Sequence, residues 1–574
     1  MFVNDRNRKV RKRMGTGTRY ESSWRKLDGW FVLSLVCLVI LVLPAVVFGS
    51  MLDRYPDVHV DEPFFNLPAA HWVRGEGFYV VAFSEMPYET ETFAKHAPLF
   101  AQTQKLTFWW FGIRHFSARV TSLLCGTLAA LILSGFLIER GYRFAPCFVA
   151  LTFVADPVWM LLLDGRPEGM ALLALSGSFL AWNRMIEHPV FWRAFLWGLT
   201  GGTAIAVHPG TLFFVAVGFM VALGILNPAR WLHVALGTTI GGAATLGYWL
   251  AAWWPLWLGS LTQFLEYVNV QKNMISETNF RHILNYLRIS RWYFFQVSAV
   301  MIFSGGLIGL GLLRNFWRLR RRWSSGQRDS TGQERLKALG QDEILFAGAA
   351  AYSTAGGLMF LAAAKFPYYM SYFMMWPPLL VAIGAERGGS LGWTRFGWVC
   401  RVLALSLLLT ALPSVAWNVT RAREAWRDYA ALDPAIALTR IQQAIPSEAN
   451  VWISPTLYQL REHLDNPIQL IPIYPRNEVP PPDVWLIFDQ THFEQQKNNR
   501  SLLANRVRLT HPRVFMVPLY QGARGGPRSI FVFPPKNANP QRITRVAGVS
   551  ELQLWVEMPI HLDDLPPFGD SSRN

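Results

Sequence analysis

Hydrophobic residues along this chain are gathered into runs of about 20, with polar segments between them. A helix of that length crosses about 30 Å of hydrocarbon. We expect eleven membrane-spanning helices, at about 30–50, 117–138, 144–163, 168–183, 193–207, 210–226, 232–254, 294–313, 344–364, 368–385 and 396–417. Gly and Pro residues at 165–167 and 208–210 predict two tight helical hairpins between neighbouring spans.

Composition supports a polytopic membrane protein. Apolar residues make up 52% of the chain and charged residues only 16%, against about 25% charged residues in soluble proteins. This excludes a disordered chain and an ordinary soluble enzyme. All four cysteines fall inside apolar runs, so we interpret them as packing residues rather than a disulfide framework.

The distribution of basic residues predicts the orientation. With the N-terminus inside, the inner segments hold about 24 Lys and Arg and the outer loops about 11. This predicts a basic cytoplasmic segment (1–29), a membrane domain (30–417) in the inner (plasma) membrane, and long outer loops at 51–116 and 255–293. The tail from 418 to 574 is then extracytoplasmic. The net charge of +16 reflects topology and lipid-headgroup contacts, so we expect membrane lipids but no nucleic acid as partners.

The tail differs in kind from the rest of the chain. It is polar and Pro-rich, and short β-like runs occur at 451–453, 468–473, 484–488 and 529–533. A helix-like stretch, 456–464, lies between the first two runs. The predicted fold class is therefore mainly α, with a small C-terminal α/β domain. The sequence shows no nucleotide loop and no cluster with metal-ligand spacing, so we predict neither a cofactor nor a metal.

Two adjacent carboxylates, Asp61 and Glu62, follow the first span by about ten residues. Near a membrane surface, such a pair provides a general base together with a second residue that positions it. The sequence leaves a second interpretation open. In that one, the pair is a solvated turn in which Asp61 caps a helix that starts at Pro63.

Further short motifs follow this pair in order. They are His96-Ala97-Pro98-Leu99, Phe111-Gly112, Ala118-Arg119 and Arg166-Pro167-Glu168. Together they resemble the bacterial branch of the family 39 glycosyltransferases, which have the GT-C fold and include protein O-mannosyltransferases and lipid A aminoarabinose transferases. The resemblance covers about 55–220 and then thins to topology and the segment 365–369. Ala97 departs from the usual second Pro of the family, and Glu168 departs from the Asp of many members.

The resemblance implies an inverting sugar transfer. The donor is a polyprenyl-phosphate-linked sugar, and the acceptor is a lipid, a glycan or a protein on the outer side. A glycosyl phosphate carries its own leaving group, and the departing phosphate needs cations. The phosphate-binding candidates are Lys95, His96, Arg281, Arg288, Arg291 and Lys365, with Tyr368 three residues after the last. Asp61 is the candidate base, Glu62 its catalytic neighbour, and Arg166 and Glu168 are candidate substrate contacts.

Each candidate has a simpler alternative. The three loop arginines are spaced at seven and three residues, so they also suit headgroup binding from one helix face. Lys365 ends a span and is placed to snorkel. Arg166 and Glu168 are also explained by a local ion pair at a helix start. The alternative function is a transporter or flippase for a lipid-linked or small polar substrate. Transporters show inverted repeats and charges at the membrane midplane, whereas here the charges cluster in the outer loops, which favours a transferase.

Overall fold

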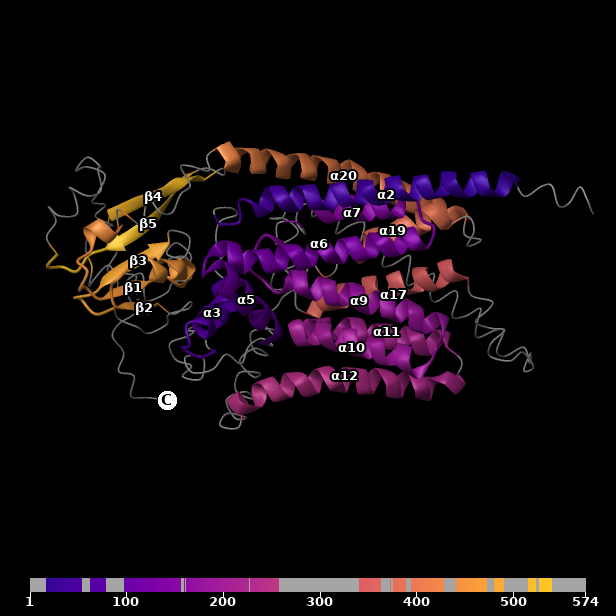
Figure 1. Ribbon diagram of the computed structural model, residues 1–574, viewed down its shortest axis with the longest axis horizontal. Coiled ribbons are helices and arrows are strands. Elements are labelled where there is room, and N and C mark those ends of the chain that lie inside the picture. The colour runs from indigo at the N-terminus through magenta and orange to yellow at the C-terminus, as the bar shows by residue number, and fades with distance from the viewer. Residues whose placement is uncertain are drawn as a thin grey trace, which may run out of the picture.

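The computed structural model describes residues 17–53, 62–78, 98–155, 159, 162–226, 228–257, 340–362, 372, 375–388, 394–427, 439, 441–471, 480–489, 511, 515–522 and 526–538. Its α-helices are α2 (Gly17–Gly49), α3 (Glu62–Val73), α5 (Pro98–Phe111), α6 (His115–Glu139), α7 (Ala145–Val154), α9 (Glu168–Glu187), α10 (Phe191–Val207), α11 (Leu212–Ile225), α12 (Pro228–Trp257), α17 (Gln341–Ala362), α19 (Trp376–Arg387) and α20 (Thr394–Arg427). Most of them run along the long axis of the molecule, with a small sheet at one end (Figure 1). The predicted combination of mainly apolar helices with a small C-terminal sheet is confirmed.

Most predicted spans that fall on described residues correspond closely to helices. By length and composition, three described helical segments could cross a membrane: Phe31–Gly49, His115–Glu139 and Gly397–Glu424. The apolar helical segments Ala145–Val154 and Pro209–Ile225 are shorter. The predicted span at 294–313 lies outside the described residues.

The third predicted span, 144–163, is wrong in length. Helix α7 ends at Val154, and Ala155 is extended, with φ −69° and ψ 144°. Pro157 explains the early end, because proline disfavours helical geometry in the residue before it and helices usually stop by that point. In the other direction, α20 continues ten residues past its predicted end, to Arg427.

The helix surfaces suit a lipid environment. Large apolar side chains such as Phe31 of α2 and Trp398 and Leu409 of α20 are exposed, which is unfavourable in water and favourable in hydrocarbon. The interior is filled by large rings, among them the fully buried Trp182, Trp197 and Trp376. The protein is therefore a multi-pass membrane protein with its core inside the helix bundle.

Glycines let some helices approach closely. A Cβ added at Gly169 of α9 would lie 2.1 Å from the Ser122 carbonyl oxygen of α6. A Cβ at Gly241 of α12 would lie 2.1 Å from the Phe195 carbonyl oxygen of α10. Small residues at helix crossings are the usual device for such contact in membranes. The close α6–α9 crossing brings together two helices that carry charged residues at the same end.

The C-terminal sheet has the strand order β2-β1-β3-β5-β4. Its strands are β1 (Val451–Ile453), β2 (Ile468–Leu470), β3 (Trp485–Asp489), β4 (Phe515–Gly522) and β5 (Gly526–Phe533). β1 is parallel to β2 and β3, whereas β5 is antiparallel to β3 and β4. The segment between β1 and β2 is a 3₁₀-helix, η3 (Pro455–Glu462), where the sequence predicted only a helix-like stretch.

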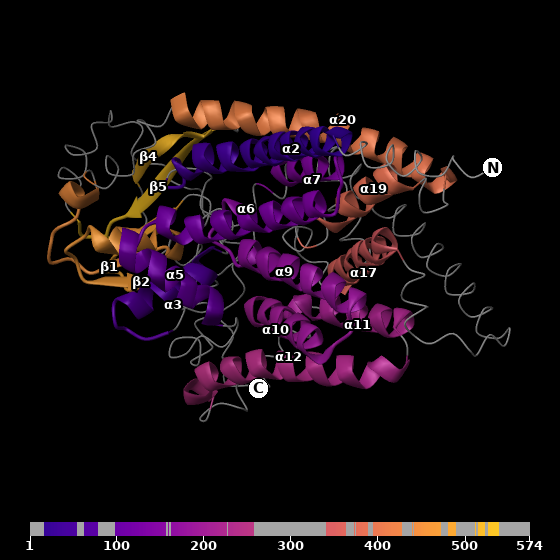
Figure 2. The same ribbon diagram turned by 45° about the vertical axis from the view of Figure 1, so that its right-hand side comes forward.

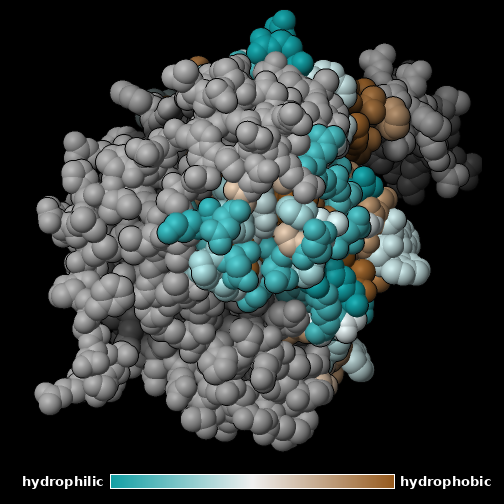
Figure 3. All heavy atoms as spheres, turned by 90° about the vertical axis from the view of Figure 1, so that its left-hand side faces the viewer, coloured by the Kyte–Doolittle hydropathy of each residue, from teal (hydrophilic) through white to brown (hydrophobic). Residues whose placement is uncertain are grey.

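One face of the sheet packs on the helices. Phe64 of α3 and Phe108 of α5 share a buried cluster with Val451 and Ile453 of β1 and Trp485 of β3. Figures 1 and 2 both show α3 and α5 beside the sheet. Seen from the left-hand side of Figure 1, where the sheet lies, the surface of the described residues is mainly hydrophilic (Figure 3).

The bundle has two ends. The sheet end is the end that lies next to the sheet. The opposite end is the one where α2, α7 and α17 begin (Figure 1). The residues that define the sheet end are Leu52, Glu62, Arg119 and Arg166, and those that define the opposite end are Arg140, Tyr142, Asp342 and Arg387.

Candidate functional site

Three segments that are distant in sequence meet at the sheet end. They are the start of α3, the second turn of α6, and the hairpin that leads into α9. Glu62 is the first residue of α3, Arg119 is four residues into α6, and Glu168 is the first residue of α9. Helix ends and a tight turn therefore supply the polar groups, while the bundle behind them is apolar.

Glu62 and Arg119 form a two-point ion pair. Arg119 donates from Nη2 to Oε1 of Glu62 at 2.8 Å and from Nε to Oε2 at 3.1 Å. Its Nη1 donates to the Leu52 carbonyl at 2.9 Å, and the Gly165 backbone N–H donates to Glu62 at 3.3 Å. The Glu62 carboxylate thus joins the start of α3 to α6 and the hairpin, and Arg119 adds the turn that follows α2.

This pair is fully buried, because both side chains have a relative exposure of 0%. Taking two charges out of water costs several kcal/mol each, which only good geometry and additional hydrogen bonds offset. The fork-to-fork arrangement of arginine and carboxylate provides that geometry. Solvent does not reach the Glu62 carboxylate, so its direct effect is to fix the backbone that follows Asp61.

A second ion pair lies in the hairpin. Arg166 donates to Oε1 of Glu168 at 3.0 and 3.2 Å, and its guanidinium lies 5.0 Å from the centre of the Phe65 ring. The local ion pair that the sequence left open is therefore present. The other carboxylate oxygen of Glu168, Oε2, is buried without a hydrogen-bond partner among the described residues. Glu168 thus keeps one buried acceptor that no described residue uses.

Amide side chains hold the hairpin against α3 and α6. Gln104 of α5 donates to Oδ1 of Asn66 at 2.6 Å and to the Ala118 carbonyl at 3.0 Å. Gly165 lies against this pair, and a Cβ there would come within 2.7 Å of the Asn66 amide. The close approach of the Asn66 side chain therefore favours Gly at this position of the hairpin.

Asp164 is a carboxylate of the site that the sequence analysis did not single out. It is half-buried, and desolvation followed by the Glu62 charge raises its pKa well above the usual range, while Arg119 and Arg166 oppose that rise. Its position in the tight hairpin, two residues before the predicted substrate contact Arg166, could have marked Asp164 as a site residue from the sequence. Arg119 was also missed as a site residue, although it stood in one of the quoted motifs.

Three of the predicted site residues are described. Glu62, Arg166 and Glu168 all lie at the sheet end, in the two ion pairs above. The other candidates lie outside the described residues: Asp61, Lys95, His96, Arg281, Arg288, Arg291, Lys365 and Tyr368. His208, which the second hairpin contains, has a structural role, because its Nδ1 accepts a hydrogen bond from the Gly210 N–H at 3.2 Å.

Comparison with known proteins gives distant structural similarities. Neither a protein-family model nor a curated protein sequence matches the chain. Among solved structures, it is similar to apo ArnT from Cupriavidus metallidurans, with 15% identity, a TM-score of 0.45 and 90% of this chain and 100% of that one covered. It is also similar to the apo oligosaccharyltransferase of Archaeoglobus fulgidus, with 12% identity, a TM-score of 0.43, and 86% of this chain and 73% of that one covered. The arabinofuranosyltransferase AftD from Mycobacteria shows 13% identity and a TM-score of 0.37, with 86% of this chain and 40% of that one covered.

Proposed function

We propose that this protein is a membrane glycosyltransferase of the GT-C type. It moves a sugar, with inversion, from a polyprenyl-phosphate carrier to a lipid, glycan or protein acceptor on the outer face of the membrane. The observation that carries the proposal is the convergence of the sequence motifs. Glu62 is bonded to Arg119, 57 residues away, and to Gly165, 103 residues away, so three of the motif segments form one polar site.

Asp61 is the base of the proposed reaction. The acceptor oxygen forms a bond to C1 of the sugar while the bond from C1 to the phosphate oxygen breaks. The electron pair of that bond leaves with the phosphate, and the acceptor proton passes to the Asp61 carboxylate. Glu62 supports this step by anchoring the residue next to Asp61 through its buried bonds to Arg119 and Gly165.

The remaining groups have binding roles in this proposal. Cations stabilise the negative charge that develops on the leaving phosphate. We assign that role to the candidate set Lys95, His96, Arg281, Arg288, Arg291 and Lys365, with Tyr368 as a hydrogen-bond donor. The spare Oε2 of Glu168 accepts from a hydroxyl of the sugar or acceptor, and Arg166 holds Glu168 in place.

The test compares two Asp→Asn variants in the same loop region. Purified protein in nanodiscs receives a panel of polyprenyl-phosphate-linked hexoses and pentoses with envelope lipid, glycan and protein fractions. We expect Asp61→Asn to lose about 10²- to 10⁴-fold in transfer rate. Asp53→Asn is the matched control, because Asp53 accepts from the Phe116 N–H at the start of α6 at 2.8 Å. It should lose about 1 kcal/mol of stability and keep its transfer rate.

Two results would contradict the proposal. Near-normal turnover of Asp61→Asn would remove Asp61 as the base. Movement of the intact lipid-linked sugar across proteoliposomes, with no bond broken, would favour the flippase alternative. Undecaprenyl phosphate is the binding probe, since it is the ligand of an ArnT structure. Both variants should bind it as the wild type does, so that a loss of transfer is assigned to the chemical step.

A further inference from the structure

Helix α5 exposes large apolar side chains, although it is too short to span a membrane. Its 14 residues extend about 21 Å at 1.5 Å per residue, against about 30 Å of hydrocarbon. Four apolar side chains near its end are exposed: Leu106 by 61%, Trp109 by 74%, Trp110 by 72% and Phe111 by 43%. These four residues form the α5 outer face. An apolar patch of this kind marks an interaction surface.

The polar side chains of α5 are turned toward the protein instead. Gln104 is fully buried and donates to Oδ1 of Asn66 at 2.6 Å. Thr107 donates to the Ser117 carbonyl at 2.7 Å, and Phe108 packs in the cluster under the sheet. A helix that faces water carries its polar residues on the outside and its apolar residues on the inside. The outer face of α5 is reversed in this respect, which suits a nonpolar surrounding.

The α5 outer face lies at the level where the bundle enters the membrane. Helix α5 ends at Phe111, and α6 begins four residues later, at His115. By length and composition, α6 could cross a membrane. Helix α5 also touches α12, because the Tyr248 hydroxyl donates to Gln102. Since Leu246 on the same stretch of α12 is 51% exposed, the outer face adjoins a lipid-facing helix surface.

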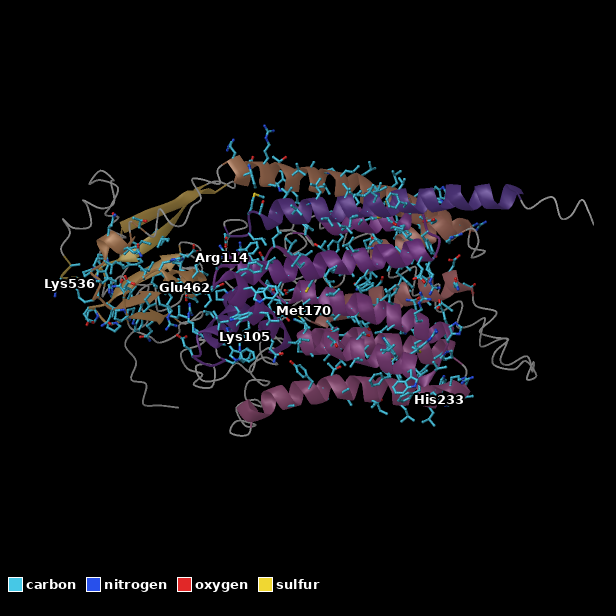
Figure 4. The ribbon with its side chains drawn as sticks, viewed as in Figure 1. Lys105, Arg114, Met170, His233, Glu462 and Lys536 are labelled. Atoms are coloured by element: carbon cyan, nitrogen blue, oxygen red, sulfur yellow. The ribbon has the colours of Figure 1, made fainter. Side chains whose placement is uncertain are left out.

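Two cations flank the α5 outer face. Lys105 lies directly before it and Arg114 three residues after it. The Lys105 ammonium lies 4.1 Å from the centre of the Trp72 ring, and Arg114 pairs with Asp53 at 3.8 Å while it stays 51% exposed. Figure 4 shows both cations where the bundle meets the sheet. Tryptophan together with Lys and Arg is the combination that the boundary between lipid and water favours.

We propose that the α5 outer face lies in the interface of the membrane leaflet at the sheet end, and that lipid covers it. The two tryptophans lie between headgroups and acyl chains, and the flanking cations contact headgroup phosphates. On its buried side, Gln104 donates to the Gly165 carbonyl at 3.4 Å, so α5 holds the hairpin before α9 at the depth of the membrane surface. This inference is independent of the proposed function, because lipid contact requires no sugar transfer.

The test measures the depth of a nitroxide label attached at Trp110→Cys. The four native cysteines, which are all free, are replaced by alanine, and the protein is placed in vesicles of phosphatidylcholine and phosphatidylglycerol. Oxygen concentrates in hydrocarbon and a nickel chelate stays in water, so their relative effects on the label report its depth. We expect oxygen to dominate, as it should at Leu409→Cys on the lipid-facing side of α20. At Lys536→Cys, an exposed position of the C-terminal domain, the nickel chelate should dominate.

Two outcomes of the labelling would overturn the inference. If the nickel chelate dominates at Trp110→Cys as it does at Lys536→Cys, the outer face lies in water. If the label at Trp110→Cys is shielded from both reagents, a protein surface, such as a second copy of this chain, covers the face in place of lipid.

A second measurement keeps the native cysteines and follows the hairpin. The double variant Trp109→Ser, Trp110→Ser replaces both rings of the outer face by small polar side chains. In the same vesicles, we expect amide hydrogen exchange of the peptide 162–170 to become several-fold faster, because α5 no longer stays at the interface and its bond to the hairpin weakens. Trp192→Ser is the matched control, since Trp192 is 69% exposed at the start of α10, at the opposite end. It should leave this exchange unchanged. Equal exchange in the double variant and the wild type would overturn the connection between lipid contact and the hairpin.

Discussion

The two ends of the helix bundle use charged residues in different ways. At the sheet end, Glu62 and Arg119 are paired with no exposure to solvent. At the opposite end, the Arg140–Glu187 pair is 7% and 9% exposed, and the Arg184–Glu139 pair is 45% and 55% exposed. An exposed pair contributes about 0.2–1 kcal/mol, whereas a buried pair is often no more stabilising than apolar residues of the same volume. Among the ion pairs of the described residues, Glu62–Arg119 is the one whose two side chains are wholly removed from solvent, so breaking it should cost the most.

Two carboxylates that lie at the starts of helices differ in how fully they are hydrogen-bonded. At the opposite end, Glu386 accepts from the backbone N–H groups of Arg143, Phe144 and Ala145, at 2.6, 3.0 and 3.0 Å. These bonds satisfy the orphan donors at the start of α7 and complement its dipole. At the sheet end, Glu168 is itself the first residue of α9, and its Oε2 has no partner among the described residues. The start of α9 thus keeps one buried acceptor that no described residue uses, whereas all three bonds to Glu386 serve the start of α7.

The largest expected effect comes from breaking the buried pair. Glu62→Gln leaves the Arg119 charge buried and uncompensated, which typically costs about 3–5 kcal/mol. We expect a large fall in the thermal midpoint of the detergent-purified protein, with lower yield of folded protein. Glu139→Gln is the matched control at the opposite end. It removes one partner of an exposed pair, and we expect a loss of no more than about 1 kcal/mol.

Replacing both buried partners refines this prediction. A Glu62→Met, Arg119→Met protein should recover much of the stability, because no unpaired charge remains. It should still transfer little sugar, because the backbone next to Asp61 loses its bonds to α6 and the hairpin. Equal midpoints for Glu62→Gln and Glu139→Gln would contradict the difference between the two ends.

A smaller effect on stability is expected from replacing a glycine in the helices that hold the site. Gly169→Ala places a Cβ 2.1 Å from the Ser122 carbonyl oxygen, so α6 and α9 must separate near the sheet end, at a cost of about 1–3 kcal/mol. Gly135→Ala, nearer the opposite end of α6, meets nothing within 4 Å and should be neutral or stabilising by up to about 1 kcal/mol. Thermal midpoints of both variants test this, and similar losses would show that the α6–α9 crossing is not specially close at Gly169.

Helix positions could be predicted from sequence because the length of an apolar run largely fixes the length of a spanning helix. The span expected at 117–138 is helix α6, His115–Glu139. Strand β4, Phe515–Gly522, was missed because Pro518 interrupts its pattern. Proline is tolerated there because β4 is the edge strand of the sheet and its register shifts at that residue. Edge position is a property of the folded sheet, which local sequence does not contain.

The site was predictable only in part, for a similar reason. Glu62 and Arg119 were both quoted from motifs, but 57 residues separate them, and spacing within one helix says nothing about such a contact. The Arg166–Glu168 pair was foreseen because its partners are two residues apart. The contact between Tyr458 and His115 was not predicted, because Tyr458 comes from the C-terminal domain and meets α6 across 343 residues of chain. Long-range pairing depends on how the domains dock.

The smallest expected effect concerns Asp164, which lies in the sheet-end hairpin and keeps part of its contact with solvent. Its folded-state pKa is raised, first by desolvation and then by the Glu62 charge, above an unfolded value of about 3.9. The folded protein therefore retains this proton where the unfolded chain has lost it, and the stability that Asp164 contributes falls as pH rises from about 4 through the raised pKa.

The Asp164→Asn variant tests this, because the amide cannot titrate. Its thermal midpoint, relative to that of the wild type, should rise as pH is raised. The measurement is the difference between the two midpoints across pH 4 to 8. A pH-independent difference, or one that shrinks with rising pH, would show that the Asp164 carboxylate is not held in its neutral form by Glu62 and its surroundings.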